Sequence, residues 1–398
     1  MGEASNKSSL FPTYARYPIT LVKGEGSRLW DDTGKCYLDL MSGLAVTSLG
    51  HSPAQVKKKL VAQLDDLWHV SNLFHIPNQE KLAKLLTDVS CADAVFFCNS
   101  GAEANEAAIK LARRYHQKVL GTGRYEIITF RQSFHGRTLA TLTATGQEKV
   151  QEGFQPLPQG FVYAPFNDAS ALSGYITDKT CAIMLEMVQA EGGVRIAEPE
   201  FVQEVARLCK EHNLLLIVDE IQTGMGRTGK WFAHEHYGIE PDIFTLAKAL
   251  GSGFPIGAML GKEKLKEAFG AGSHGSTFGG TPIATAAGIA TVETLLEGKL
   301  SERAAEMGQY AMNRLREELN GHPLVKEVRG LGLLIGIECH EPVADILAKI
   351  HEQGVLVVSA GPNVIRLLPS LLVTKEELDE GIAVISKVMA GYSLAVKE

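Results

Sequence analysis

Short apolar segments alternate with helical segments through the middle of the chain, and this alternation limits the possible folds more than any other feature of the sequence. The apolar segments have the length of buried strands, whereas 102–115 and 200–212 have the character of helices. Strands that alternate with helices form a mostly parallel sheet covered by helices on both faces. The predicted strands are 94–98, 125–130, 181–187, 214–218, 243–246 and 255–260.

The carboxyl-terminal part of the chain predicts a second, smaller unit of α+β type. A long helix is expected from Thr281, a capping residue followed by proline, to about Leu296. The first 45 residues are rich in glycine and polar turns, so we expect them to pack on this unit instead of folding alone. The predicted large domain is 46–285, and the small domain combines 1–45 with 286–398. The strands of the small domain are predicted at 325–339, 355–359 and 364–368.

Composition narrows the classes of function. The chain of 398 residues is 45% hydrophobic and 21% charged, as in soluble globular proteins, and its net charge of -7 gives no general attraction for nucleic acid. No apolar run approaches the roughly 18 residues that span a membrane, and the amino terminus lacks the apolar core of a signal peptide. Six dispersed cysteines fit reduced thiols in a cytoplasmic protein. No group of His, Cys and carboxylate residues has metal-ligand spacing, so no metal site is expected.

Two charged residues follow predicted interior strands and suggest a specific chemistry. Asp219 closes the strand at 214–218, and Lys248 comes shortly after the strand at 243–246. The carboxyl ends of parallel strands are where α/β sheets collect their ligands. A lysine placed there either extends to solvent or is used chemically. Pyridoxal phosphate needs a lysine that holds it as a Schiff base and an acid at its pyridinium nitrogen, so its binding is the leading hypothesis.

Residues 99–102 form a possible phosphate site between the strand at 94–98 and the helix that follows. A helix N-terminus presents free N–H groups and the positive end of its dipole, and Ser100 adds a hydroxyl. The alternative is that Ser100 only caps the helix. The glycine pattern at 224–229 formally matches a dinucleotide-binding fingerprint. It neither follows a first strand directly nor opens a helix, so we interpret it as a turn and reject a nicotinamide site.

Other motifs have both a functional and a structural interpretation. Phe134 could stack on a flat cofactor and Arg137 could bind a carboxylate, or they could be a core phenylalanine and a surface arginine. Ser276 and Thr277 lie in a glycine-rich loop that suits anion contact, although a plain loop is equally consistent with the local sequence.

Arg366 and Glu191 are candidates for a charge pair. Arg366 lies in an apolar strand, where its permanent charge needs an acidic partner or an anionic ligand. Glu191 follows the strand at 181–187 and is either a turn residue or the removable partner of Arg366. Spacing in the sequence does not decide between these two interpretations.

Five segments together closely resemble the class III aminotransferases, which are pyridoxal-phosphate enzymes of fold type I. The segments are 99–106, 133–138, 219–224, 245–248 and 274–280, and the resemblance extends in order over essentially the whole chain. Within the class the chain is most similar to the acetylornithine aminotransferase group, on segments 21–26, 42–46, 255–260 and 365–369. The resemblance implies a large domain with a mostly parallel sheet flanked by helices and a smaller α+β domain.

The resemblance also implies roles for individual residues. Lys248 would hold the cofactor and shuttle a proton between the substrate carbon and the cofactor, and Asp219 would keep the pyridine nitrogen protonated. The other implied cofactor contacts are Ser100, Gly101 and Ala102 at the phosphate, Phe134 and Ile221 on the two ring faces, Gln222 at the ring hydroxyl, and Thr277 at the phosphate of a neighbouring subunit. The active unit would therefore be a homodimer.

The implied reaction moves the δ-amine of N-acetylornithine to 2-oxoglutarate, giving N-acetylglutamate 5-semialdehyde and glutamate in arginine biosynthesis. The keto acid would place its carboxylates on Arg366 and Arg137, whereas the donor would use Arg137 alone. Glu191 would then neutralise Arg366 until the keto acid arrives, because an unpaired buried charge costs several kcal/mol. Ser276 completes the candidate substrate contacts.

Donor specificity is the most open part of the hypothesis. The segment around Glu191 departs from the family pattern at Met187 and Ala190. The same chemistry could therefore serve ornithine, succinylornithine, succinyl-diaminopimelate or 4-aminobutyrate. A nicotinamide-dependent oxidoreductase would rest only on the rejected glycine pattern. A non-enzymatic binding protein would have no need of Lys248, Asp219 and Arg366 together.

Overall fold

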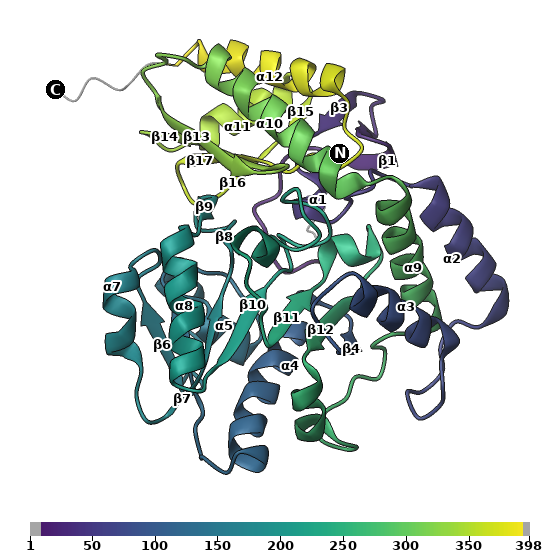
Figure 1. Cartoon of the computed structure of the whole chain (residues 1–398). Helices are drawn as coiled ribbons and strands as arrows, with labels where there is room; N and C mark the ends of the chain where they lie inside the picture. The colour runs from purple at the N-terminus through teal and green to yellow at the C-terminus, as the bar shows by residue number, and fades with distance from the viewer. Residues whose placement is uncertain (1–8, 393–398) are drawn as a thin grey trace.

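The computed structural model describes residues 9–392. The chain forms a larger body around a seven-stranded sheet and a smaller body that contains the carboxyl-terminal helices and the first strands (Figure 1). The domain boundaries at 45 and 285 remain predictions, and the prediction about a signal peptide falls mainly on residues 1–8, outside the described range. Among the described residues, no helix is both long enough and apolar enough to span a bilayer.

The large sheet has the strand order β4-β12-β11-β10-β7-β5-β6. β12 is antiparallel to both of its neighbours, and the remaining pairs are parallel, which confirms the prediction of a mostly parallel sheet. The six predicted strands are present, and β6, an edge strand, was not predicted. The bounds are β4 (Ala94–Cys98), β5 (Glu126–Phe130), β6 (Phe161–Ala164), β7 (Thr180–Leu185), β10 (Leu215–Asp219), β11 (Ile243–Leu246) and β12 (Gly257–Gly261).

Helices cover both faces of this sheet, and the alternation of side chains along β10 shows it. Leu215 and Ile217 belong to one buried cluster, which includes the apolar side of α4, whereas Leu216 and Val218 belong to the main core on the opposite face. A strand buried on both faces must be apolar throughout, as β10 is up to Asp219. The helices of the large body are α2 (Ala54–Asp66), α3 (Pro77–Asp88), α4 (Gly101–Arg114), α5 (Leu139–Ala144), α6 (Glu148–Gln151), α7 (Ala169–Leu172), α8 (Pro199–Glu211) and α9 (Pro282–Glu297).

The smaller body contains two four-stranded sheets. One has the order β13-β14-β17-β16, and the other, β1-β2-β3-β15, joins the amino-terminal strands to β15 near the carboxyl end. The elements are β1 (Leu21–Glu25), β2 (Arg28–Asp31), β3 (Cys36–Asp39), α1 (Ser42–Ala45), α10 (Leu300–Glu318), β13 (Val325–Leu331), β14 (Leu334–Cys339), α11 (Ala344–Glu352), β15 (Val355–Leu356), β16 (Val358–Ser359), β17 (Val364–Leu367) and α12 (Lys375–Met389).

Two predicted strands of the small unit were wrong in detail. The segment 325–339 is a hairpin of two strands, because Gly332, with φ of 57°, turns the chain between them. The segment 355–359 is divided into β15 and β16, which belong to different sheets. Apolar composition alone does not mark such breaks, since β14, β15 and β16 are all buried or partly buried.

Candidate active site

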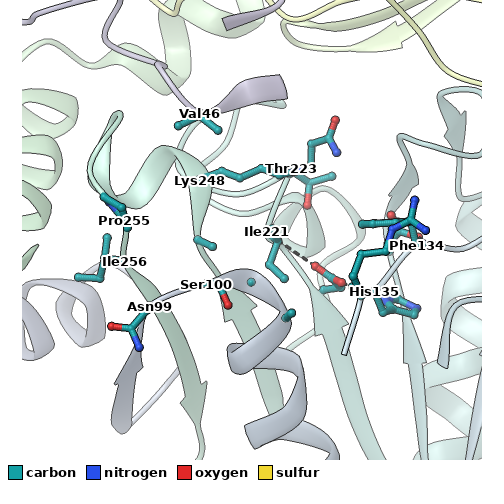
Figure 2. A pocket seen from close by; sticks show the side chains of 18 of the residues that line it. Val46, Asn99, Ser100, Phe134, His135, Ile221, Thr223, Lys248, Pro255 and Ile256 are labelled. Atoms are coloured by element: carbon teal, nitrogen blue, oxygen red, sulfur yellow. Dashed lines mark hydrogen bonds and ion pairs between the residues drawn. The ribbon is translucent and has the colours of Figure 1, made fainter. Parts of the chain in front are cut away.

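A cavity of about 590 Å³ lies at the carboxyl ends of the central strands (Figure 2). Figure 2 shows Val46 above Lys248, and Ser100 and Asn99 below it. The cavity combines charged groups with apolar walls, as small-molecule sites do. Nine of the predicted site residues line it: Ser100, Gly101, Ala102, Phe134, Arg137, Asp219, Ile221, Gln222 and Lys248.

Asp219 is held at the end of β10 by a network of hydrogen bonds. Its Oδ2 accepts from Asn105 Nδ2 at 2.8 Å and lies 2.8 Å from His135 Nδ1, while its Oδ1 accepts from the backbone N–H of Ile221 at 3.0 Å. Thr245 in the neighbouring strand donates to Asn105 Oδ1 at 2.7 Å and so fixes the amide. The carboxylate therefore has a defined direction inside the cavity.

The sequence prediction did not include Asn105 and His135 among the site residues. Both fall within the segments that carried the family resemblance, but their side chains act on Asp219 across three elements of the fold. A polar residue among the alanines of α4 was the only local signal for Asn105. The partner of a buried amide or imidazole depends on tertiary structure, so sequence position alone could not identify it.

Lys248 follows β11 in a strained backbone conformation. Its φ is +42°, in the left-handed region that β-carbon sterics disfavour for non-glycine residues. Its ammonium makes no hydrogen bond or ion pair with any residue that the structure describes. Burial lowers the pKa of the Lys248 amine below its ordinary value, against the opposing charge of Glu191. The neutral amine, which is the nucleophilic form, is thus more populated than in an exposed lysine.

The amino end of α4 forms one wall of the cavity. Ser100 caps the helix, since its Oγ accepts from the N–H of Glu103 at 3.2 Å, and it also lines the cavity. The next N–H groups, of Gly101 and Ala102, have no acceptor within the helix. A β-carbon on Gly101 would lie 2.8 Å from Ile221 Cδ1, so glycine lets the Ile221 side chain pack against the helix end. This wall can accept an anionic group beside an aliphatic surface.

Phe134 and Arg137 lie on the loop after β5. The Arg137 guanidinium lies 5.4 Å from the centre of the Phe134 ring, an arrangement that favours a cation over an aromatic face. Within the described residues Arg137 makes no hydrogen bond and no ion pair. It is exposed at the cavity wall, so its donors are available to a carboxylate ligand.

Arg366, Glu191 and Gln222 form a connected group next to the cavity. Arg366 is 1% exposed, and its Nη1 donates to Glu191 Oε1 at 2.6 Å and to Gln222 Oε1 at 2.9 Å. Its Nε has no partner in the described residues. Although burial opposes ionisation, the guanidinium keeps the pKa of the Glu191 carboxyl below its ordinary value. The structure thus shows the two charges paired.

Glu186 is a buried acid of the cavity that the sequence prediction did not include. Its Oε2 accepts from the backbone N–H of Phe134 at 3.0 Å. Burial, reinforced by the negative charge of Asp219, raises the pKa of its carboxyl well above the ordinary value. The protonated, neutral form of Glu186 is therefore favoured more than in an exposed glutamate. Its position at the end of β7 was the available signal.

The structure does not bring Ser276 and Thr277 into this cavity. Ser276 Oγ accepts from Asn99 Nδ2 at 3.1 Å, so it lies behind a residue that lines the wall. Thr277 is exposed and is not among the residues that line the cavity. Neither residue contacts the cavity within one chain.

The residues of the cavity fit pyridoxal phosphate. They provide an amine without a partner, a carboxylate oriented by two side chains, and a helix end with free N–H groups. An aromatic ring and an aliphatic side chain are available for the two faces of a flat ring. Gln222 is the exception, because in this structure its amide contacts Arg366 and, at 3.4 Å, Glu191.

Comparisons with known proteins agree with this chemistry. Residues 12–389 match the family model described as Aminotransferase class-III. The chain is 52% identical to an acetylornithine aminotransferase from Oceanobacillus iheyensis, over 96% of each sequence. It superposes with a TM-score of 0.92 on an ornithine aminotransferase from Toxoplasma gondii whose structure describes pyridoxal phosphate at the active site (33% identity; 96% of this chain and 92% of that one). An N-acetylornithine aminotransferase from Stenotrophomonas maltophilia gives a TM-score of 0.83 (37% identity; 95% and 97%).

Proposed function

The chain belongs to the class-III aminotransferase family, and from this we propose that it transfers the δ-amino group of N2-acetyl-L-ornithine to 2-oxoglutarate. The products are N-acetylglutamate 5-semialdehyde and L-glutamate, and the reaction is a reversible step of arginine biosynthesis. The names of its curated relatives support this donor. The observation that carries the proposal is the Glu191–Arg366 pair, which can present either a neutral or a cationic surface to the substrate.

The enzyme depends on pyridoxal 5'-phosphate, which supplies, when bound, the carbonyl that exchanges the amino group and a ring that accepts electrons. Lys248 Nζ would hold the cofactor, and its free amine would accept the proton from the substrate carbon and deliver it to the cofactor carbon. Its lowered pKa suits this task, because the amine must be neutral to accept a proton. Asp219, oriented by Asn105 and His135, would stabilise a proton on the ring nitrogen of the cofactor.

The two substrates differ in how many carboxylates they bring to the cavity. Arg137, which has no partner in the described residues, binds the carboxylate common to both. With the acetylated donor, Glu191 keeps Arg366 neutralised, as in the present structure at 2.6 Å. With 2-oxoglutarate, the second carboxylate replaces Glu191 on Arg366, whose Nε is also available.

The proposed active unit is a homodimer in which Thr277 contacts the cofactor phosphate of the neighbouring subunit. Thr277 is exposed and lies outside its own cavity. Large apolar side chains are exposed on the same loop and on the loop before α3, including Phe278 and Phe74. An association of two chains would cover them. All six cysteines are free, which supports the proposed location in the cytoplasm.

The donor is tested by mixing the enzyme with N-acetyl-L-ornithine or with L-ornithine in the absence of a keto acid. The visible absorbance of the lysine-bound cofactor is lost when the amino group is transferred. We expect a much faster loss with the acetylated donor. A faster reaction with ornithine would reassign the donor within the family, and the absence of a visible band after addition of pyridoxal phosphate would refute the assigned chemistry.

A further inference from the structure

The β-hairpin that carries Glu191 has a second side, which faces a separate groove. The hairpin consists of β8 (Val188–Gln189) and β9 (Arg195–Ile196), and Glu191 lies in the turn between them. Gln189 and Arg195 are paired across the two strands and both line a groove of about 540 Å³. The opposite wall of the groove comes from β13 and β14 of the smaller body. The Glu191 carboxylate instead contacts Arg366 beside the active-site cavity.

Two arginines in this groove have donors available. Arg131, after β5, and Arg195, on β9, are exposed, and neither side chain has a hydrogen bond or ion pair with any residue between 9 and 392. The other two cations of the groove are already paired, Lys326 with Glu338 and Arg329 with both Glu327 and Glu338. Two free guanidinium groups facing one groove are suited to two carboxylates.

A buried acceptor also lacks a partner in this groove. Gln189 is 1% exposed, and its Nε2 donates to the backbone carbonyl of Arg131 at 3.0 Å. That contact fixes the orientation of the amide, because a flipped amide would place two oxygens against each other. Its Oε1 is left without a hydrogen bond from any described residue. Since buried polar atoms are normally satisfied, a donor is missing at this position.

We propose that this groove binds a small dicarboxylate that also carries a hydrogen-bond donor, either a hydroxy acid or an amino acid. Its carboxylates pair with Arg131 and Arg195, and its hydroxyl or ammonium group donates to Gln189 Oε1. An ammonium group would also pair with Glu198, an acid of the same groove. The Glu198 side chain makes no hydrogen bond or ion pair with any described residue.

Occupation of the groove would affect the position of Glu191. Arg329, on the groove wall, donates to the carbonyls of Gly193 at 2.5 Å and Val194 at 2.9 Å, within the turn of the hairpin. Gln189 lies two residues before Glu191 on the same hairpin. A ligand bridging Arg131 and Arg195 would therefore hold the hairpin against the loop after β5. This part of the inference rests on the proposed role of Glu191, whereas the binding site itself does not.

Calorimetric titration of the cofactor-bound enzyme with L-malate, L-aspartate and succinate tests the site. The three probes share one carbon skeleton and differ in having a hydroxyl, an ammonium group or no donor. We expect L-malate or L-aspartate to bind about tenfold more tightly than succinate, as one hydrogen bond to a buried acceptor implies. Tighter L-malate binding identifies a hydroxy acid, and tighter L-aspartate binding an amino acid. Binding of a probe in the active site is detected separately, as a change in the visible absorbance of the cofactor.

The variants Arg195→Gln and Arg131→Gln should each weaken the tighter probe by about tenfold or more, because each removes a charge-assisted contact. Arg207→Gln, on the exposed face of α8, makes the same change of charge and should bind as the wild type does. Equal binding in all three variants would overturn the site. In the wild type, but not in Arg195→Gln, the bound probe should change the ratio of half-reaction rates for L-glutamate and the ω-amine donor. An unchanged ratio would overturn the link to Glu191.

Discussion

Arg366 and Glu191 are 175 residues apart in the sequence, yet their side chains meet at 2.6 Å beside the cavity. The sequence identified Arg366 as a charge that needs a partner, and it left Glu191 either as that partner or as a turn residue. Their pairing depends on β17 lying against the turn of the β8–β9 hairpin, which no local pattern encodes. Lys248 and Asp219 were easier to select as candidates, because Asp219 closes an apolar strand and Lys248 comes shortly after one.

Replacement of Glu191 tests its role at the level of a single side chain. In Glu191→Ala, Arg366 loses its ionic partner whenever the ω-amine donor is bound. We expect kcat/KM for that donor to fall about 10- to 100-fold, equivalent to about 1.5–3 kcal/mol for a hydrogen bond between charged groups. The half-reaction with L-glutamate should be little affected, because its second carboxylate pairs with Arg366. Stopped-flow absorbance of the cofactor measures both rates.

Glu191→Gln is the matched control, since it keeps the shape of the side chain but removes its charge. It should fall between the wild type and Glu191→Ala for the ω-amine donor. Equal losses for both donors in Glu191→Ala would show that the residue maintains the site without selecting between substrates.

At the level of elements, the strands of the large sheet could be predicted because they are buried on both faces and therefore uniformly apolar. The hairpin at β8 and β9 was missed, since two strands of two residues each have no recognisable period. Gly192 explains how it packs. A β-carbon there would lie 2.5 Å from the backbone carbonyl of Gln132, in the loop after β5. The hairpin can approach that loop only with glycine at this position.

Gly192→Ala should therefore displace the hairpin and Glu191 with it. We expect a loss of stability of about 1–3 kcal/mol, typical of overpacking, together with weaker discrimination between the ω-amine donor and L-glutamate. Thermal unfolding and the paired half-reaction rates measure the two effects. Gly174→Ala is the control, because a β-carbon there meets nothing within 4 Å. If Gly192→Ala discriminates between the ω-amine donor and L-glutamate as the wild type does, the position of the hairpin does not determine donor specificity.

At the level of the whole molecule, the loop that carries Ser276 and Thr277 could not be placed relative to the cavity from the sequence. Ser276 and Thr277 were predicted at the site, and within one chain they lie outside the cavity. Their loop is joined to the loop before α3, because Asn72 Nδ2 donates to the carbonyls of Ser276 at 3.0 Å and Gly279 at 2.9 Å. Both loops expose apolar side chains, with Leu73 90% exposed. Local sequence does not show which apolar residues remain uncovered after folding.

The apolar surface of these two loops should be where the subunits of the proposed dimer meet. The substitution Phe74→Asp, at a residue that is 66% exposed, would place a charge in that contact. We expect a shift toward monomer in sedimentation velocity and weaker retention of pyridoxal phosphate, since Thr277 of the other chain is lost from the site. Phe154→Asp changes a similarly exposed ring on the loop before β6 and should leave the assembly unchanged. Identical sedimentation of both variants would locate the contact elsewhere.

Lys248 is proposed to hold the cofactor in the cavity beside Asp219. Borohydride reduction of the cofactor-bound enzyme, followed by peptide mass spectrometry, fixes pyridoxal phosphate to the lysine that carries it. We predict that the label lies on Lys248 and is absent from the Lys248→Ala variant, whose fold is checked by circular dichroism. A label on another lysine, or an unlabelled wild-type enzyme that still transfers amino groups, would show that Lys248 does not hold the cofactor.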